Sequence, residues 1–211
     1  MEATIGTVLK QMKQEGQLPS KTPCYLPQNS LESRKNLTPA LMAWKNKYPA
    51  IKDFLVGFSP NRQLQVCNNP EECFFGNSPT LASINIIYEK GTAEIWLSAE
   101  IQEACLFMGV REMPDINQIE KLVKIIVVQY GYLKVDELQL FFFYFCVAKY
   151  RHFYNYFDPS IIILSLRDFL NDRSRAYEEH ERRGREREYE EWKKNAITYE
   201  EYQKLKSENQ L

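Results

Sequence analysis

Apolar residues recur at helical spacing over most of the chain after residue 36, and the pattern is clearest in residues 115–130. Three charged residues in this segment, Glu120, Lys121 and Lys124, fit the opposite face of a helix. The segment is rich in β-branched residues, which makes a strand the competing interpretation. Steps of three and four favour the helix, because they place the apolar side chains on one face. The apolar positions are Ile116, Ile119, Leu122, Val123, Ile126, Val127 and Tyr130.

The most apolar stretch of the chain predicts a second helix, from about Asp136 to Lys149. Asp136 and Gln139 have the spacing of a capping box, in which two side chains satisfy amides at the start of a helix. The helix is apolar on nearly every side, so it is either surrounded by other helices or lies in lipid. Its apolar part, residues 138–148, has about half of the roughly 20 residues that cross a bilayer. We therefore expect a buried central helix.

The pair Asp158-Pro159 is expected to begin the next helix, because Asp is a strong N-cap and Pro is favoured at the first helical position. The two helices then form a hairpin joined by residues 150–157. Burying one large aromatic or aliphatic side chain contributes about 1.5–3 kcal/mol, so this hairpin should hold much of the stability of the fold. The face of the second helix is lined by Ile162, Leu166, Phe169 and Leu170.

Shorter helices are expected after two similar pairs, Thr38-Pro39 and Ser78-Pro79. The helix that follows Ser78-Pro79 should end at Gly91. Residues 93–108 should form another helix, with Gly109 as its C-cap, because glycine tolerates the left-handed conformation that ends many helices.

Residues 57–77 are rich in Pro, Asn, Gly and Ser, and we expect a loop there, with a short strand at residues 63–66 as an alternative. Cys67 and Cys73 lie in this segment. Five residues separate them, and neither a nearby His nor a second Cys pair completes a zinc ligand set. We expect no metal site and no cofactor.

The C-terminal part is strongly charged, with nine basic and nine acidic residues between Arg167 and Lys194. Acid-first pairs four residues apart, such as Glu178–Arg182 and Glu190–Lys194, each stabilise an isolated helix by about 0.2–0.5 kcal/mol. The segment lacks the apolar heptads of a coiled coil, so we expect a solvated helix. Thr198 and Glu201 have the spacing of a further capping box, which predicts a last short helix.

These patterns predict an all-α protein with three parts. Residues 1–35 form an irregular basic arm with a short helical pattern at Ile5–Glu15, residues 36–175 a compact helical core, and residues 176–211 a charged helical extension. The formal charge of −1 conceals a gradient: residues 1–62 carry nine basic against four acidic residues, and residues 63–132 carry four against nine. A basic arm can contact an acidic partner or phosphates, although ordinary variation along a surface gives the same pattern.

Composition narrows the class of protein further. The five cysteines are an odd number, the N-terminus lacks an apolar signal-peptide core, and no apolar segment is long enough to cross a membrane, so we expect a reduced cytoplasmic protein.

The histidines, which are candidates for catalysis, are His152 and His180. A nucleophile pair of Cys146 with His152 is disfavoured because Cys146 lies in an apolar helix. We expect no enzymatic activity.

The candidate contact set lies in the connection between the two apolar helices, where basic and aromatic residues alternate. Aromatic rings can stack on bases while basic groups pair with phosphates, so a nucleic-acid site is one interpretation. The alternative is that the aromatic residues belong to the core and the basic ones to an ordinary surface. The set is Lys149, Arg151, His152, Tyr154 and Tyr156.

Four segments resemble a family of uncharacterised small helical proteins from phages and mobile elements of gut Bacteroidetes. They are SPTLASINIIYEKG, WLSAEIQEACLFMG, LKVDELQLFFFYF and FYNYFDPSIIILSLRDFL followed by a charged tail, and the similarity spans residues 78–183. In that family glycines commonly follow Tyr in the turn before the Asp-Pro pair, where this chain has Arg151 and Asn155. Asn adopts positive φ more readily than Arg, so close backbone approach at Arg151 is not expected.

The resemblance implies no established activity, but it suggests a class of function. The overall pattern is somewhat similar to phage replication accessory proteins such as helicase loaders, which is an analogy of fold alone. We expect a non-enzymatic accessory protein that binds a replication protein, DNA or both through the contact set. The alternative is a scaffold protein that docks a partner through its charged C-terminal helix. The oligomeric state stays open.

Overall fold

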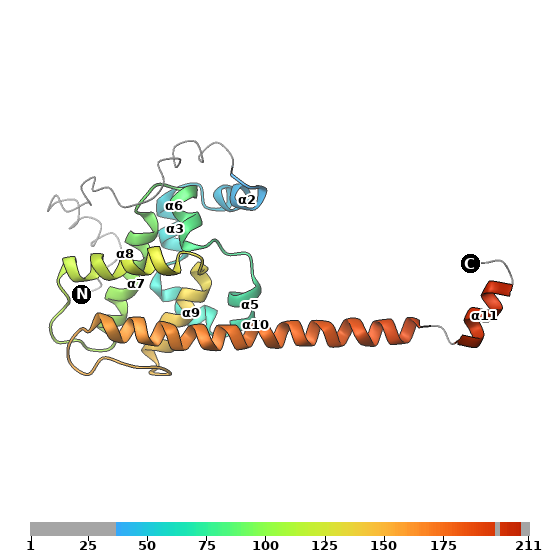
Figure 1. Ribbon diagram of the computed structural model, residues 1–211. Coiled ribbons are helices and arrows are strands. Elements are labelled where there is room, and N and C mark those ends of the chain that lie inside the picture. The colour runs from blue at the N-terminus through green and yellow to red at the C-terminus, as the bar shows by residue number, and fades with distance from the viewer. Residues whose placement is uncertain (1–36, 197–198, 208–211) are drawn as a thin grey trace. The chain divides into compact units, whose positions relative to one another are not determined.

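The computed structural model describes residues 37–196 and 199–207, and this part of the chain is built from helices (Figure 1). Within it no β-strand forms, and two isolated bridges join Thr80 to Lys134 and Glu112 to Tyr156. The all-α prediction is therefore confirmed. The arm predicted at residues 1–35 lies outside the described residues.

The helices predicted after Thr38-Pro39 and over residues 115–130 are present. α2 (Pro39–Lys47) begins after Thr38, whose hydroxyl accepts a hydrogen bond from a first-turn amide at 3.4 Å. α3 (Ile51–Gly57) follows it. The helical interpretation of residues 115–130 is confirmed by α8 (Ile116–Tyr130). Its inner face buries five of the seven apolar residues predicted from their spacing, while Ile116 and Val127 are half-buried. The buried residues are Ile119, Leu122, Val123, Ile126 and Tyr130.

The loop expected at residues 57–77 is wrong, and so is the strand alternative at residues 63–66, because the segment folds as short helices. Two of them start at the pairs Ser59-Pro60 and Asn69-Pro70. Proline at the first helical position gives up an amide that has no partner within the helix, so these pairs carry the same signal as Thr38-Pro39. The helices are η3 (Pro60–Arg62), α4 (Gln63–Val66) and α5 (Pro70–Phe75).

The boundary between the next two helices also differs from the prediction. α6 (Leu81–Ile87) has Thr80 rather than Ser78 as its N-cap, and the Thr80 hydroxyl accepts a hydrogen bond from a first-turn amide at 3.2 Å. Gly91, expected to end this helix, is instead the N-cap of α7 (Thr92–Phe107). Its φ of 98° is a conformation that glycine adopts at little cost.

Helix α9 (Val135–Cys146) is the buried helix predicted from its apolar sequence, but its first turn is shifted. The N-cap is Lys134, whose backbone amide donates a hydrogen bond to Glu137 Oε2 at 2.9 Å. The predicted Asp136–Gln139 capping box is therefore wrong, because both residues lie inside the helix and their side chains bind elsewhere. The buried residues of α9 are Val135, Asp136, Glu137, Leu138, Gln139, Leu140, Phe141, Phe142 and Phe145.

The elements around α9 bury it by close packing. α7 packs against α6, α8 and α9, while α9 also packs against α4 and α5 (Figure 1). The Phe141 ring contacts Phe145, with centroids 5.9 Å apart, and Phe169 of α10, with centroids 5.7 Å apart. The Phe-rich segment is therefore interior helix, as expected.

Helix α10 (Pro159–Asn195) starts at the predicted Asp158-Pro159 pair, and Asp158 Oδ1 accepts a hydrogen bond from the Ser160 amide at 2.9 Å. The chain divides into two compact units, one ending at Phe169 and the other starting at Leu170. The second unit contains the rest of α10 and α11 (Tyr199–Ser207). The predicted capping residue Thr198 lies outside the described residues.

Candidate functional site

The connection between α9 and α10 is held in place on several sides. The Arg111 amide donates a hydrogen bond to the Asn155 carbonyl at 3.2 Å, next to the bridge between Glu112 and Tyr156. Ser165 Oγ of α10 donates to the Arg151 carbonyl at 3.4 Å. The Phe153 ring is buried against Phe145 and Phe157, with centroids 5.2 and 5.5 Å apart. The backbone of the connection is therefore preformed.

We call the predicted contact set in this connection the aromatic turn: Lys149, Arg151, His152, Tyr154 and Tyr156. The structure brings His152 and Tyr154 together, with ring centroids 4.7 Å apart. Tyr154 and Tyr156 are 76% and 66% exposed, which is high for side chains of this size. The alternative that the aromatic residues of this connection are simply core holds for Phe153, but it does not hold for these two tyrosines.

The basic groups of the aromatic turn have neighbours of their own. Lys149 Nζ lies 3.9 Å from the centroid of the Tyr144 ring and 5.3 Å from that of Tyr150. Arg151 Nε lies 3.6 Å from Asp168 Oδ2. Such contacts stabilise the cations where they are and partly compensate their charge. The aromatic turn is thus richer in exposed aromatic surface than in uncompensated positive charge.

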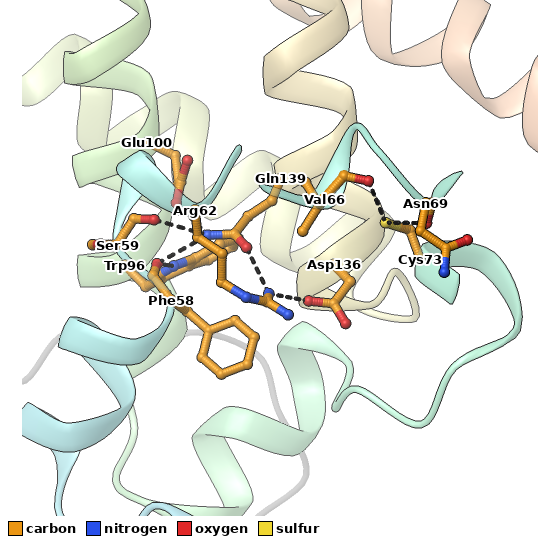
Figure 2. A network of polar contacts seen from close by, with 10 residues as sticks. All are labelled: Phe58, Ser59, Arg62, Val66, Asn69, Cys73, Trp96, Glu100, Asp136 and Gln139. Carbon is orange, nitrogen blue, oxygen red and sulfur yellow. Dashed lines mark hydrogen bonds and ion pairs between the residues drawn. The ribbon is translucent and has the colours of Figure 1, made fainter. Parts of the chain in front are cut away.

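A second polar cluster, which sequence analysis missed, lies inside the first unit between η3, α4, α7 and α9 (Figure 2). Glu100 of α7 is 0% exposed. Its Oε2 accepts a hydrogen bond from Gln63 Nε2 at 2.6 Å, and its Oε1 accepts one from Gln139 Nε2 at 3.2 Å. We call Arg62, Gln63, Glu100, Asp136 and Gln139 the buried polar cluster.

Gln139 is the centre of the buried polar cluster. Its Nε2 also lies 3.1 Å from each of the carbonyl oxygens of Phe58 and Ser59, so its two hydrogens are shared among three acceptors. Its Oε1 accepts a hydrogen bond from Arg62 Nη1 at 2.8 Å, and the same guanidinium pairs with the Asp136 carboxylate (Figure 2). The Arg62 guanidinium lies over the Phe58 ring at 4.3 Å. One amide side chain therefore ties α9 to η3 and α7.

Burial changes the acid–base behaviour of Glu100. Removal of the carboxylate from water raises the pKa of Glu100 to about 8, although the hydrogen bonds from Gln63 and Gln139 oppose the shift. A neutral Glu100 carboxyl keeps both contacts. If the Gln63 amide rotates by 180°, its oxygen accepts a hydrogen bond from the Oε2 hydroxyl of Glu100, while Gln139 Nε2 still donates to Oε1. The 2.6 Å distance suits an O–H···O bond.

The buried polar cluster does not have the features of a catalytic site. Gln63, Glu100 and Gln139 are buried, so a substrate has no approach to their polar atoms. Its chemistry is instead that of a tie between helices, because each buried polar atom must find a hydrogen-bond partner in the protein. The sequence did carry a signal for it, since Glu100 continues an otherwise apolar stripe at steps of three and four: Ala93, Trp96, Glu100 and Ala104.

The thiols of Cys73, Cys105 and Cys146 are not activated. Desolvation raises the pKa of Cys73, Cys105 and Cys146 to about 12 each. A thiol with so high a pKa is almost entirely protonated at neutral pH and is a poor nucleophile and metal ligand.

Across residues 37–196 and 199–207, no group of three His, Cys, Asp or Glu side chains could hold a metal ion. No helix in the described ranges has the length and apolar character needed to cross a membrane.

Comparison with known proteins relates about half of the chain to a family. Residues 112–210 are similar to a family of unknown function, DUF6633. No curated protein and no solved structure matches the chain. The matched region contains α8, α9, the aromatic turn, α10 and α11, whereas Gln63 and Glu100 lie outside it.

Proposed function

We propose that the chain is a non-enzymatic, cytoplasmic accessory protein of a phage or mobile element, and that the aromatic turn binds its partner. The mobile-element origin rests on the family resemblance of residues 78–183. The partner we place first is a protein, in keeping with the expected role beside a replication protein. DNA is the second candidate ligand for the same turn.

The observation that carries this proposal is the exposure of Tyr154 and Tyr156 on a preformed backbone. Tyrosine is enriched at the centres of protein interfaces, where its ring supplies a large contact area and its hydroxyl a hydrogen bond. The turn is already held by Arg111 and Ser165, so binding there orders little additional backbone. A fixed pair of exposed rings is therefore suited to contact a partner protein.

The charges around the turn favour a protein over DNA. Binding to single-stranded DNA draws much of its affinity from cations that neutralise phosphates. Here Arg151 lies beside Asp168, and Lys149 lies over the Tyr144 ring. Phosphates would have to compete with these contacts, whereas a partner that packs on the two tyrosine rings leaves them intact.

The test compares two double variants in a pull-down from the native host followed by mass spectrometry. We expect Tyr154→Ala/Tyr156→Ala to lose a protein that the wild-type chain captures, while Tyr154→Phe/Tyr156→Phe, which keeps both rings, retains it. Capture that is unchanged in the alanine variant would contradict the assignment of the partner to the turn.

The DNA alternative is measured separately, by fluorescence anisotropy of a labelled single-stranded oligonucleotide over a range of salt concentrations. We expect no binding that weakens with salt. Salt-dependent binding that disappears in Lys149→Ala/Arg151→Ala, but not in a matched Lys90→Ala/Lys52→Ala variant, would make DNA the ligand of the turn in place of a protein.

A second candidate function, a scaffold that docks a partner through the C-terminal helix, is favoured by a repeated motif. The motif is Tyr-Glu-Glu, then a residue with an aromatic or His ring, then a basic residue two positions later. It occurs three times: Tyr177–Arg182, Tyr189–Lys194 and Tyr199–Lys204. In the second copy the Tyr189 and Trp192 rings are exposed and stack with centroids 5.9 Å apart. The region similar to DUF6633 contains all three copies.

The motif has a physical basis on a helix. Its two rings are three residues apart and lie on one face, while its first Glu and its basic residue are four apart and support the helix. Three copies would let one partner molecule with several equivalent sites bind with increased avidity. Loss of the captured protein in Tyr189→Ala/Trp192→Ala, with capture intact in the Tyr154/Tyr156 variant, would favour the scaffold function.

A further inference from the structure

The connection between α7 and α8 runs beside the aromatic turn. The Arg111 amide binds the Asn155 carbonyl, and Glu112 forms a parallel β-bridge with Tyr156. Residues directly opposite each other in a bridge project to the same side, within reach of each other's side chains. Glu112 and both tyrosines of the turn are exposed. We call Glu112, Tyr154 and Tyr156 the glutamate–tyrosine surface.

Glu112 brings a negative charge to this surface. None of the basic side chains in the described part of the chain forms an ion pair with it. The same connection carries a second exposed carboxylate, Asp115, against one cation, Arg111. This agrees with the acidic balance of residues 63–132, which contain nine acidic and four basic residues. A cation that approaches the turn from this side therefore meets a carboxylate open to pairing.

The cations of the aromatic turn are held by other elements. Lys149 Nζ lies over the Tyr144 ring of α9, and Arg151 Nε lies 3.6 Å from Asp168 Oδ2 of α10. Neither contact involves the connection between α7 and α8. The glutamate–tyrosine surface thus combines an exposed carboxylate with exposed aromatic rings, and both attract cations.

We infer that the partner of the aromatic turn presents an arginine side chain to the glutamate–tyrosine surface, and that Glu112 sets the preference for its charge. A guanidinium is planar and weakly hydrated, so it stacks on a tyrosine ring while its N–H groups pair with a carboxylate. Arginine and tyrosine are enriched among the residues that dominate binding energy, and such residues tend to face each other across an interface. The inference rests on the proposed function and deepens it, because it names the chemistry of the partner.

The first test uses a defined probe, the peptide acetyl-Gly-Arg-Gly-amide, and its analogue with the neutral citrulline in place of arginine. In an NMR titration of the full chain, the arginine peptide should shift the ring signals of Tyr154 and Tyr156, and the citrulline peptide should bind several-fold more weakly. Glu112→Gln should weaken binding of the arginine peptide about two- to fivefold, the scale of one exposed ion pair. Glu89→Gln, the same change at an exposed glutamate between α6 and α7, should leave it unchanged.

Three results of this titration would each overturn the inference. The first is equal affinity for the arginine and citrulline peptides. The second is equal affinity of the wild-type and Glu112→Gln chains for the arginine peptide. The third is an arginine peptide that leaves the ring signals of Tyr154 and Tyr156 unmoved.

The second test separates the inference from the proposed function in the pull-down from the native host. Glu112→Lys reverses the charge at an exposed position and leaves both tyrosines in place. Together with the peptide result, loss of the captured protein in Glu112→Lys and in Tyr154→Ala/Tyr156→Ala, but not in the matched Glu89→Lys, supports the inference. Loss in the tyrosine variant alone would overturn the inference and leave the proposed function intact. Capture that both variants retain would overturn the proposed function itself.

Discussion

The side-chain nitrogen of Gln139 on α9 lies 3.2 Å from Oε1 of Glu100 on α7, and neither residue is exposed to solvent. The same nitrogen binds the carbonyls that follow α3, and the Gln139 oxygen binds Arg62 of η3. A buried amide in this position satisfies polar groups from three directions. The stability of the first unit should therefore depend on the protonation and identity of these few side chains.

The first prediction concerns the pH dependence of stability. The pKa of Glu100 is raised from 4.5 to about 8 in the folded chain by burial. The folded state thus holds its proton more tightly than the unfolded state, so the contribution of Glu100 to stability is fully present below pH 4.5 and falls as pH rises towards 8. Since one pKa unit corresponds to about 1.4 kcal/mol, the loss is on the order of a few kcal/mol.

The variant Glu100→Gln should remove this dependence, because its side chain is neutral at every pH and can keep the contacts with Gln63 and Gln139. We expect it to unfold at a higher urea concentration than the wild type at pH 8, and its stability to change much less between pH 5 and pH 8. Urea unfolding at both pH values measures this. A wild-type chain whose stability rises over that interval through a Glu100-dependent step would contradict the raised pKa.

The second prediction concerns the pair of Arg62 and Asp136, whose side chains are 27% and 12% exposed. Arg62→Met removes both the ion-pair partner of the largely buried Asp136 carboxylate and a hydrogen bond to Gln139. This change should lower the free energy of unfolding by about 1–3 kcal/mol, which is less than for a fully buried pair. Arg62→Met/Asp136→Asn should recover part of the loss, since no unpaired charge then stays behind. Equal stabilities of the two variants in urea unfolding would show that the ion pair contributes little.

The main helices of the fold could be predicted from local sequence patterns. The positions of α8, α9 and the start of α10 followed from apolar spacing and from Asp158-Pro159, because those residues decide burial and capping locally. Residues 57–77 were misinterpreted because α4 and α5 are too short to show a helical period. Their start signals, Pro60 and Pro70, were present but appeared in a segment whose Asn and Gly content is typical of loops.

The polar contacts could not be predicted in the same way, because their partners are distant in sequence. Gln63 and Glu100 are 37 residues apart, and Arg62 and Gln139 are 77 apart. Only the packing of α4, α7 and α9 brings them together. The spacing of Asp136 and Gln139 therefore indicated a local capping box instead of these distant contacts. The clustering of the aromatic turn was local and thus predictable, whereas the pairing of Arg151 with Asp168 needed the fold.

The third prediction concerns Gly184, which lies within the continuous helix α10. A Cβ added there would meet no atom within 4 Å. Gly184→Ala should therefore increase helix stability by about 0.5–1 kcal/mol, because alanine loses less backbone freedom on folding than glycine. Circular dichroism of the full chain should show more helix at elevated temperature, while Arg185→Ala, a change between two good helix formers, should alter it little. No gain in Gly184→Ala would indicate that the glycine relieves a constraint in the second unit.

The last prediction compares the ends of α7 and α9, which have the same hydrogen-bonding pattern but different residues in the left-handed position. In α9 it is Ala148, with φ of 56°, and in α7 it is Gly109, with φ of 68°. The amides of Ala148 and Lys149 bind the carbonyls of Phe145 and Tyr144 at 3.1 and 2.9 Å, which is the pattern of a Schellman motif. A Cβ in this conformation costs about 1–2 kcal/mol.

Ala148→Gly should therefore stabilise the chain by about 0.5–1 kcal/mol, since the strain is relieved while the unfolded state gains some freedom. Gly109→Ala is the matched opposite change: its Cβ would meet no atom within 4 Å, so only the backbone strain should count, and it should destabilise by about 1 kcal/mol. Urea midpoints of both variants measure the pair. The aromatic turn begins directly after Ala148. If the Ala148→Gly chain is more stable but captures the partner of the turn less well, the left-handed alanine sets the position of Lys149 and Arg151. Equal capture would assign the strain to helix termination alone.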